Sequence, residues 1–208
     1  MKISDRDVLL VVDVQNDFCT GGALPVPGGE KVVPAINRIA RKFTNVVLTQ
    51  DWHPLDHVSF APNHVGKQPF QTIELDYGTQ VLWPTHCVQG TAGAEFHRHL
   101  DVTRANMLVR KGFRRGIDSY SALFENDHRT PTGLLGYLRE RELKTVFVAG
   151  LALDFCVRFS AEDARKAGFT VAVIEDACRG IDLDGSVAAA HRRFRELGIS
   201  IVSLEAFL

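Results

Sequence analysis

The chain has 208 residues, of which 45% are hydrophobic and 24% charged, and its formal net charge is -1. This composition is typical of a globular protein, and the balanced charge gives no reason to expect a nucleic acid or an anionic membrane as partner. No apolar run approaches the roughly 18 residues that a membrane-spanning helix needs, and residues 1–7 lack the apolar core of an export signal. We therefore expect one domain over residues 1–208, located in the cytoplasm.

Short apolar runs without alternation recur along the chain, and such runs are typical of strands that are buried on both faces of a parallel sheet. They occupy residues 8–12, 46–48, 107–109, 146–149, 171–174 and 199–202. Helical patterns alternate with them, beginning with apolar side chains at a 3.6-residue period over residues 30–43. Three further helices are expected to begin at Thr130–Pro131, at Asp154 and at Asp184, the last two ending at Gly168 and Gly198.

Strands that alternate with helices predict an α/β fold, with an open, mostly parallel sheet and helices on both faces in a Rossmann-type three-layer arrangement. Residues 52–106 fit this pattern less well, because they are rich in His, Pro and Gly and have weak periodicity. A long irregular segment inside a compact domain is usually functional.

Chemically reactive side chains follow four of the apolar runs. Asp13 follows the first run, Asp51 and His53 follow the second, Lys111 the third and Cys156 the fourth. If these strands are parallel, the groups gather at the carboxyl edge of the sheet, where open α/β sheets bind ligands. The sequence therefore predicts a functional site at this edge.

Cys156 is the candidate nucleophile, because it lies near the start of a predicted helix and helix N-termini favour the thiolate. A nucleophilic thiol also needs a base and a partner for negative charge, which Asp13 and Lys111 can supply. The alternatives are a buried structural cysteine and a structural ion pair between Asp13 and Lys111. The remaining cysteines are expected to be reduced structural residues: Cys19, Cys87 and Cys178.

A candidate metal site lies around the second apolar run. On an extended chain the side chains of Asp51 and His53 point the same way, and Pro54 favours extended backbone at His53. His57 lies four residues beyond His53, and His86 could complete the set. A carboxylate with two or three imidazoles suits one divalent transition ion, namely zinc, iron or manganese.

Short segments spread over almost the whole chain form one recognisable pattern. They are DVQNDFC at 13–19, GGAL at 21–24, VPGG at 26–29, DWHP at 51–54, WPTHCVQGT at 83–91, KG at 111–112, DSYS at 118–121 and GLALDFCV at 150–157. Together they resemble the bacterial nicotinamidase/pyrazinamidase family of the isochorismatase-like cysteine hydrolase superfamily. The WPxHC segment separates nicotinamidases from most of that superfamily.

The resemblance implies a catalytic triad at Asp13, Lys111 and Cys156. It also implies an oxyanion hole formed by the backbone amides of Ala152 and Cys156, beside a cis peptide bond at Leu151–Ala152. The fold implied is isochorismatase-like, in agreement with the three-layer α/β arrangement.

Metal and substrate contacts are implied in the same way. The metal ligands are Asp51, His53 and His86, with His57 at a position that is a ligand in some members only, and zinc is the first choice of metal. The aromatic residues that sandwich the substrate ring match Phe18 and Trp83, with Tyr120 as a further wall.

The activity implied is hydrolysis of nicotinamide to nicotinate and ammonia, and of pyrazinamide to pyrazinoate, through a cysteine thioester in NAD salvage. The nearest alternative is a related cysteine amidohydrolase, with or without a metal, such as one acting on N-carbamoyl compounds. A non-catalytic metal-binding protein is a second alternative, which an ammonia-release assay would separate from the enzyme. The only partner implied is small-molecule nicotinamide, and a homo-oligomer is left open.

Overall fold

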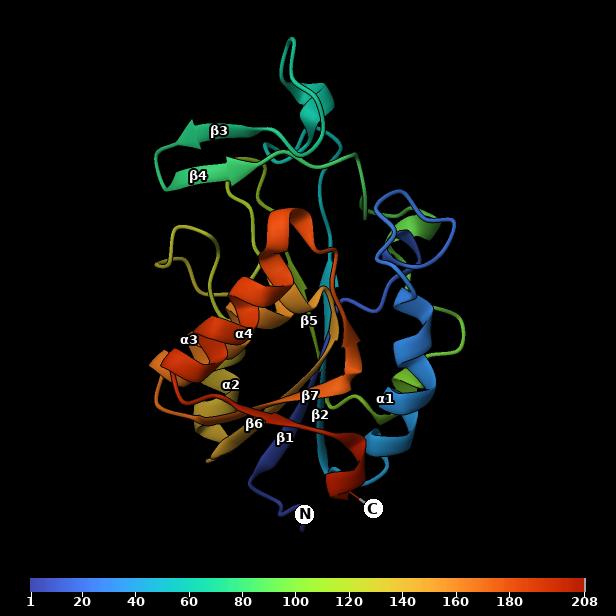
Figure 1. Cartoon of the computed structure of the whole chain (residues 1–208), viewed down its shortest axis with the longest axis vertical. Coiled ribbons are helices and arrows are strands. Elements are labelled where there is room, and N and C mark those ends of the chain that lie inside the picture. Colours follow the sequence, from blue (N-terminus) through green and yellow to red (C-terminus); the bar gives the residue numbers. More distant parts are fainter. Residues whose placement is uncertain (208) are drawn as a thin grey trace.

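A parallel sheet of six strands forms the centre of the protein, whose computed structural model describes residues 1–207 (Figure 1). The strand order is β5–β2–β1–β6–β7–β8, and each neighbouring pair is parallel. The strands are β1 Asp7–Val12, β2 Asn45–Asp51, β5 Met107–Lys111, β6 Thr145–Leu151, β7 Thr170–Arg179 and β8 Ser200–Val202. Each predicted apolar run coincides with one of these strands, so the predicted α/β fold is confirmed.

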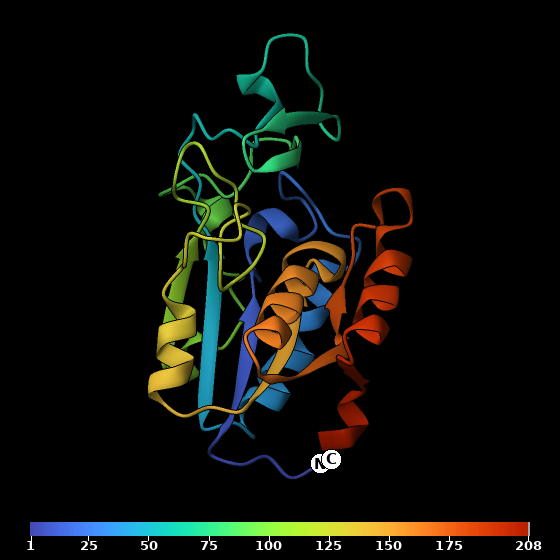
Figure 2. The same cartoon turned by 90° about the vertical axis from the view of Figure 1, so that its left-hand side faces the viewer.

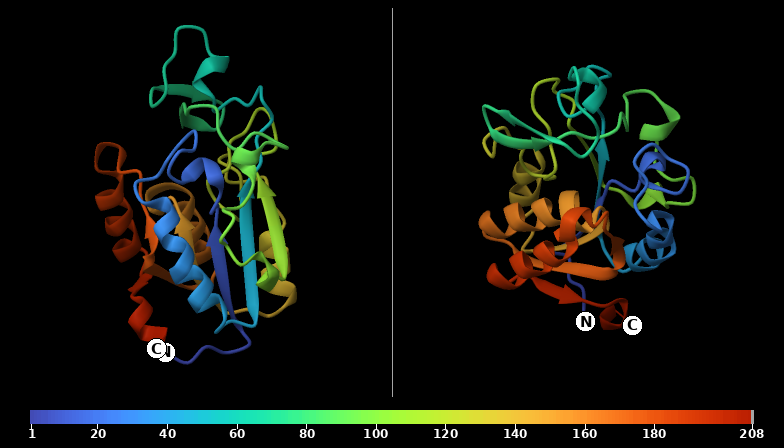
Figure 3. Two further views of the ribbon diagram at one scale, coloured as in Figure 1. Left: turned by 90° about the vertical axis from the view of Figure 1, so that its right-hand side faces the viewer. Right: turned by 45° about the horizontal axis from the view of Figure 1, so that its top comes forward.

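Helices cover both faces of the sheet and give the protein three layers (Figures 2 and 3). Helix α1 (Val32–Ala40) packs on one face. The opposite face is covered by α2 (Leu134–Glu140), α3 (Arg158–Lys166) and α4 (Ser186–Glu196). Within residues 1–207, no helix has the length and apolarity to cross a membrane.

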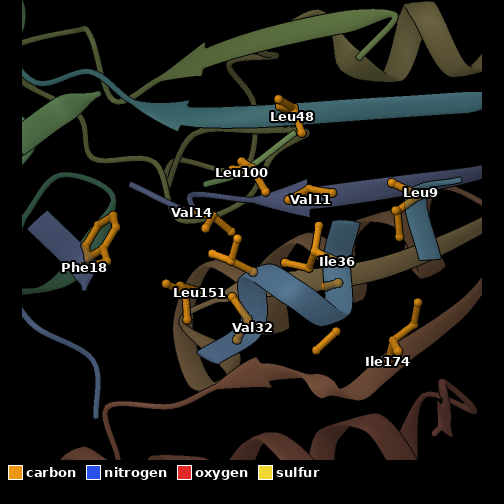
Figure 4. Close-up of a cluster of buried hydrophobic side chains, with 14 of the residues drawn as sticks. Leu9, Val11, Val14, Phe18, Val32, Ile36, Leu48, Leu100, Leu151 and Ile174 are labelled. Atoms are coloured by element: carbon orange, nitrogen blue, oxygen red, sulfur yellow. The ribbon is translucent and has the colours of Figure 1, made fainter. Parts of the chain in front are cut away.

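Each face of the sheet has its own hydrophobic core, which explains why the strands read as continuous apolar runs. In β1, Leu9 and Val11 belong to the core on the α1 side, which Figure 4 shows, whereas Val8 and Leu10 belong to the other core. The first core extends to Phe18, beyond the end of β1 (Figure 4). Burial on both faces, worth about 25 cal/mol per Å² of apolar surface, fixes the strand ends on which the site is built.

Helix α2 begins later than predicted. Pro131 does not open the helix but forms an isolated antiparallel bridge with Phe124. The helix begins at Leu134, after Gly133 at a φ of 104°. Glycine tolerates this left-handed backbone at no steric cost, so it can redirect the chain here.

The predicted caps at Asp154 and Asp184 are also wrong. Asp154 lies inside a π turn, Leu153–Val157, that precedes α3, and its carboxylate binds a distant loop. Asp184 has a φ of 49° and lies in a short turn before α4. The predicted stops are confirmed, since Gly168 and Gly198 follow α3 and α4 in left-handed backbone.

The irregular segment 52–106 contains a hairpin that the sequence analysis missed. Its strands, β3 (Thr72–Leu75) and β4 (Gly78–Val81), pair antiparallel and lie above the carboxyl edge of the sheet (Figure 1). Most of their side chains are exposed or half-buried. β3 alternates polar and apolar residues over only four positions and β4 does not alternate, so the hairpin gives too short a pattern to be identified from the sequence.

The strand order reverses between β1 and β6. From β1 the chain moves to β2 on one side, and it later continues from β6 to β7 on the other. Ligands in open α/β sheets bind at such a switch point, in the crevice beyond the carboxyl ends of the strands. Both termini lie at the opposite end of the molecule (Figure 1).

Candidate active site

Four adjacent strands each bring one reactive side chain to the carboxyl edge of the sheet. Lys111 ends β5 and is the register partner of Asp51, which ends β2. Asp13 follows β1, and Cys156 lies on the π turn after β6. Side-chain atoms of Asp13, Asp51 and Cys156 lie within 4.8 Å of one another. The structure thus brings these four predicted residues together.

The ammonium group of Lys111 is fully buried at the centre of this group. Its Nζ lies 2.8 Å from Asp13 Oδ2 and 3.4 Å from Cys156 Sγ, and it donates to Asp51 Oδ1 at 2.5 Å and to Ser119 O at 2.7 Å. Burial alone lowers the pKa of a lysine, but Asp13 and Asp51 outweigh it and raise the pKa of Lys111 above its ordinary value. The contact with Asp51 goes beyond the sequence prediction, which pairs this lysine with Asp13 alone.

The two carboxylate oxygens of Asp13 have different partners. Oδ1 accepts a hydrogen bond from Thr49 Oγ1 at 2.6 Å. Oδ2 lies 2.8 Å from Lys111 Nζ, in a fully buried ion pair. Burial raises the pKa of Asp13 to about 6, although the lysine opposes the shift. Asp13 is therefore ionised at neutral pH, yet basic enough to take up and return a proton.

The thiol of Cys156 is buried, and burial raises its pKa well above the ordinary value despite the nearby Lys111. The expectation that a helix start lowers this pKa is wrong. The residue lies inside the π turn, and the carboxylates of Asp13 and Asp51 disfavour a second negative charge. The resting group is a thiol, so its reaction requires a base.

The backbone before the π turn supplies an amide to the same place. The Leu151–Ala152 peptide bond is cis, in agreement with the expectation. Ala152 lines the pocket beside Cys156, and its amide donates to no backbone carbonyl among residues 1–207.

Asp51, His53 and His86 form a group whose donor atoms lie within 4.8 Å of one another. His53 Nδ1 is 2.8 Å from Gly112 O, and His86 Nδ1 is 2.8 Å from Pro84 O. Because a carbonyl only accepts, each Nδ1 carries the proton and each Nε2 keeps its lone pair. Both Nε2 atoms lie within 4.0 Å of Asp51 Oδ2.

This arrangement fits a divalent transition ion. Two imidazoles oriented by backbone carbonyls, with one carboxylate, are a typical ligand set. Burial and the neighbouring His53 lower the pKa of His86 to about 4, so His86 is neutral at pH 7 as a ligand must be. His53 differs, because Asp51 outweighs burial and raises its pKa.

His57 is not brought into this group. Its Nδ1 lies 2.7 Å from Ser59 Oγ and its Nε2 lies 3.2 Å from Ile117 O. Its ring packs against that of His53 at a centroid distance of 4.3 Å. His57 thus contacts a member of the group while both of its own nitrogens are engaged elsewhere.

A narrow pocket opens beside the thiol. Phe18, Trp83 and Tyr120, the three aromatic residues expected from the resemblance, all line it. The other lining residues are Leu24, Asp51, His53, His86, Asp118, Ala152, Phe155, Cys156 and Ile181. The pocket therefore joins apolar walls to the reactive groups and to the metal-type ligands.

Four residues that line the pocket were not predicted as site residues, namely Leu24, Asp118, Phe155 and Ile181. Phe155 packs edge-on against Trp83 at 4.9 Å, and its position next to Cys156 is the signal that could have identified it. Ile181 comes from the segment after β7, where no sequence pattern marks it. Within the aromatic part, Trp83 Nε1 donates to Tyr120 Oη at 3.0 Å, which holds two distant segments together.

The other three cysteines do not line this pocket. Burial raises the pKa of each thiol, to about 11 for Cys19, to about 12 for Cys178 and well above the ordinary value for Cys87. Cys156 is thus the only cysteine in residues 1–207 that lies beside both Asp13 and Lys111 at the pocket.

The fold and the site define an open α/β protein with a thiol, a carboxylate and a lysine at the switch point of its sheet. The chain matches the isochorismatase domain over residues 7–206 and therefore belongs to the isochorismatase family.

Relatives of known activity extend this assignment. The chain is 53% identical over 203 residues to a nicotinamidase of Acinetobacter baylyi, a match that covers 98% of this chain and 95% of the relative. The solved structure of an Acinetobacter baumanii nicotinamidase/pyrazinamidase is 55% identical, with a TM-score of 0.98 and full coverage of both chains. A Pyrococcus horikoshii pyrazinamidase in complex with zinc is 36% identical, with a TM-score of 0.78 over 95% of this chain and 99% of the other.

Proposed function

We propose that the protein hydrolyses nicotinamide to nicotinate and ammonia, and pyrazinamide to pyrazinoate, with Cys156 as the nucleophile. The observation that carries the proposal is the buried carboxylate of Asp13 next to the buried thiol of Cys156, at the end of a pocket with aromatic walls. Relatives that match nearly the whole chain are nicotinamidases, and this supports the same substrate class.

In the proposed mechanism the residues of the site account for each proton. Asp13 removes the thiol proton of Cys156 as the sulfur attacks the amide carbon. The carbonyl electron pair moves onto oxygen, which the amides of Ala152 and Cys156 stabilise. The C–N bond then breaks, and Asp13 returns the proton so that ammonia leaves and a thioester remains.

Hydrolysis of the thioester completes the proposed cycle. Asp13 takes a proton from water while the water oxygen attacks the acyl carbon. The C–S bond breaks, the carboxylic acid leaves as nicotinate, and the sulfur recovers a proton. Throughout, Lys111 remains charged and offsets the carboxylates of Asp13 and Asp51, which would otherwise oppose formation of a thiolate.

We assign Asp51, His53 and His86 as the residues that hold one divalent metal ion, with zinc as the first choice. When bound, the ion would supply Lewis-acid chemistry at the pocket wall that faces the substrate ring. The zinc complex of the Pyrococcus horikoshii relative supports this choice. Phe18 and Trp83 bind the ring by its faces, because stacking requires a flat π system.

The proposal also includes the cellular location and the metabolic role of the protein. All four cysteines are free, which is typical of a reducing compartment, so we place the protein in the cytoplasm. Nicotinate formed there would re-enter the synthesis of NAD.

Ammonia release from nicotinamide, measured together with metal content on the same sample, tests the proposed function. We expect turnover of nicotinamide and pyrazinamide and little turnover of an N-carbamoyl amino acid. Preference for the N-carbamoyl compound would instead assign the protein to the related cysteine amidohydrolases.

A further inference from the structure

The carboxylate of Asp154 links the turn that carries the thiol to a wall of the pocket. Asp154 lies two residues before Cys156 and is 1% exposed. Its Oδ1 accepts the amide N–H of Ile181 at 3.0 Å, and its Oδ2 accepts the amide of Asp182 at 2.7 Å and the hydroxyl of Ser186 at 2.5 Å. The mechanism above gives this buried carboxylate no role.

The segment that Asp154 holds has an unusual backbone. The φ values of Asp182, Asp184 and Gly185 are 60°, 49° and 80°. Residues other than glycine rarely adopt this left-handed region of the backbone. The amides of Ile181 and Asp182 point at the carboxylate instead of joining a strand ladder or a helix. Conformations of this kind persist only where the surroundings impose them.

The same segment is closely seated against the π turn. A side chain at Gly180 would place its Cβ 2.4 Å from Val187 Cγ2 and 3.2 Å from Asp154 Oδ1. Ile181, the next residue, lines the substrate pocket. The three hydrogen bonds of Asp154 therefore tie this wall directly to the turn that carries Cys156.

We infer that Asp154 is a positioning residue that acts on the substrate through Ile181. This inference rests on the proposed function, because it concerns the wall against which the substrate ring lies. Displacement of an apolar wall weakens binding of the ring, whereas Asp13 and Lys111 remain at the strand ends and Cys156 remains on the turn that joins β6 to α3. The loss of Asp154 should consequently raise KM more than it lowers kcat.

The variants Asp154→Asn, Ile181→Ala and the double variant form a test cycle. The asparagine keeps the size of the side chain but presents an N–H₂ group where the carboxylate accepts hydrogen bonds. We expect each single variant to raise KM for nicotinamide about tenfold, with kcat within about threefold of wild type. If Asp154 acts through Ile181, the double variant should be no worse than Ile181→Ala.

Asp127 provides a matched control. Its carboxylate also accepts two backbone amides and one hydroxyl, from Arg129 and Thr130, but it lies outside the pocket. Asp127→Asn should lower Tm without raising KM. Ser186→Ala, which removes only one of the three bonds to Asp154, should fold normally and raise KM about twofold, should Asp154→Asn prove too unstable to assay.

Hydrogen exchange supplies a readout that does not depend on turnover. In Asp154→Asn the amides of Ile181 and Asp182 should exchange faster, while those of β6 keep their rates. Additive KM effects in the double variant, or a fall in kcat with unchanged KM, would overturn the inference in an active enzyme. Absence of ammonia release by the wild type would overturn the proposed function instead, whatever the exchange rates show.

Discussion

The two sides of the pocket are built in different ways. The charged side comes from the ends of four adjacent strands, where the sheet register places Asp13, Asp51 and Lys111 beside the turn that carries Cys156. The apolar side comes from separate loops and depends on side-chain hydrogen bonds, such as that from Trp83 to Tyr120. The sheet therefore holds the reactive groups in place. The walls that contact the substrate can change without moving the reactive groups.

The largest effect should follow from removing the thiol on the charged side. Cys156→Ala should lower kcat/KM by about 10⁴-fold or more, because no other residue can form the thioester. Cys19→Ala, Cys87→Ala and Cys178→Ala should keep substantial activity, since these residues do not line the pocket. Steady-state ammonia release measures the four variants, and near-normal turnover by Cys156→Ala would refute the mechanism.

Loss of the metal should affect the point where the two sides meet. Chelation, or His86→Ala, should lower activity by at least about 100-fold, with recovery of the chelated enzyme on adding zinc, manganese or iron. Metal analysis should find about one ion per wild-type chain and less in His86→Ala. An active wild type without bound metal would contradict the assignment.

His57→Ala separates a ligand from a neighbour of a ligand. Both ring nitrogens of His57 have other partners, so we expect this variant to retain more metal than His86→Ala. Equal loss of metal in the two variants would show that His57 binds the ion directly.

Substrate analogues test the apolar side together with the metal ligands. Pyrazinamide keeps a ring nitrogen and should be hydrolysed, whereas benzamide keeps the flat ring but has no nitrogen to offer the ion. We expect kcat/KM for benzamide to be lower by about 100-fold, and lower still for a short aliphatic amide. If benzamide and nicotinamide react equally well, the aromatic walls alone recognise the substrate ring, and the metal ion does not contact the ring nitrogen.

The smallest effect concerns the pH profile. Asp13 acts as a base only when ionised, and burial raises its pKa to about 6, so kcat/KM should fall as pH decreases through about 6. Thr49 donates to Asp13 and helps to lower that pKa, so Thr49→Val should move the acid limb to higher pH by less than about one unit. An acid limb that is unchanged in Thr49→Val would assign it to another group.

Sequence alone determined the charged side of the site. Uniform apolar runs predict strands buried on both faces, and a polar residue shortly after such a run is expected near the carboxyl edge of a parallel sheet. Asp13, Asp51, Lys111 and Cys156 could therefore be placed together without coordinates. Local rules also found the glycines that end α3 and α4.

Only the tertiary structure decided the rest, because the interactions concerned join residues far apart in the chain. The raised pKa of Cys156 arises from burial among carboxylates, which no local pattern reveals. The strands of the β3–β4 hairpin have four residues each, which is too short for the alternation in β3 to stand out. Asp154 reads as a helix cap from its neighbours, yet its carboxylate binds amides more than twenty residues away, beside the Ile181 wall. These long-range contacts form only when the sheet is complete, because the sheet brings the loops at the ends of its strands together.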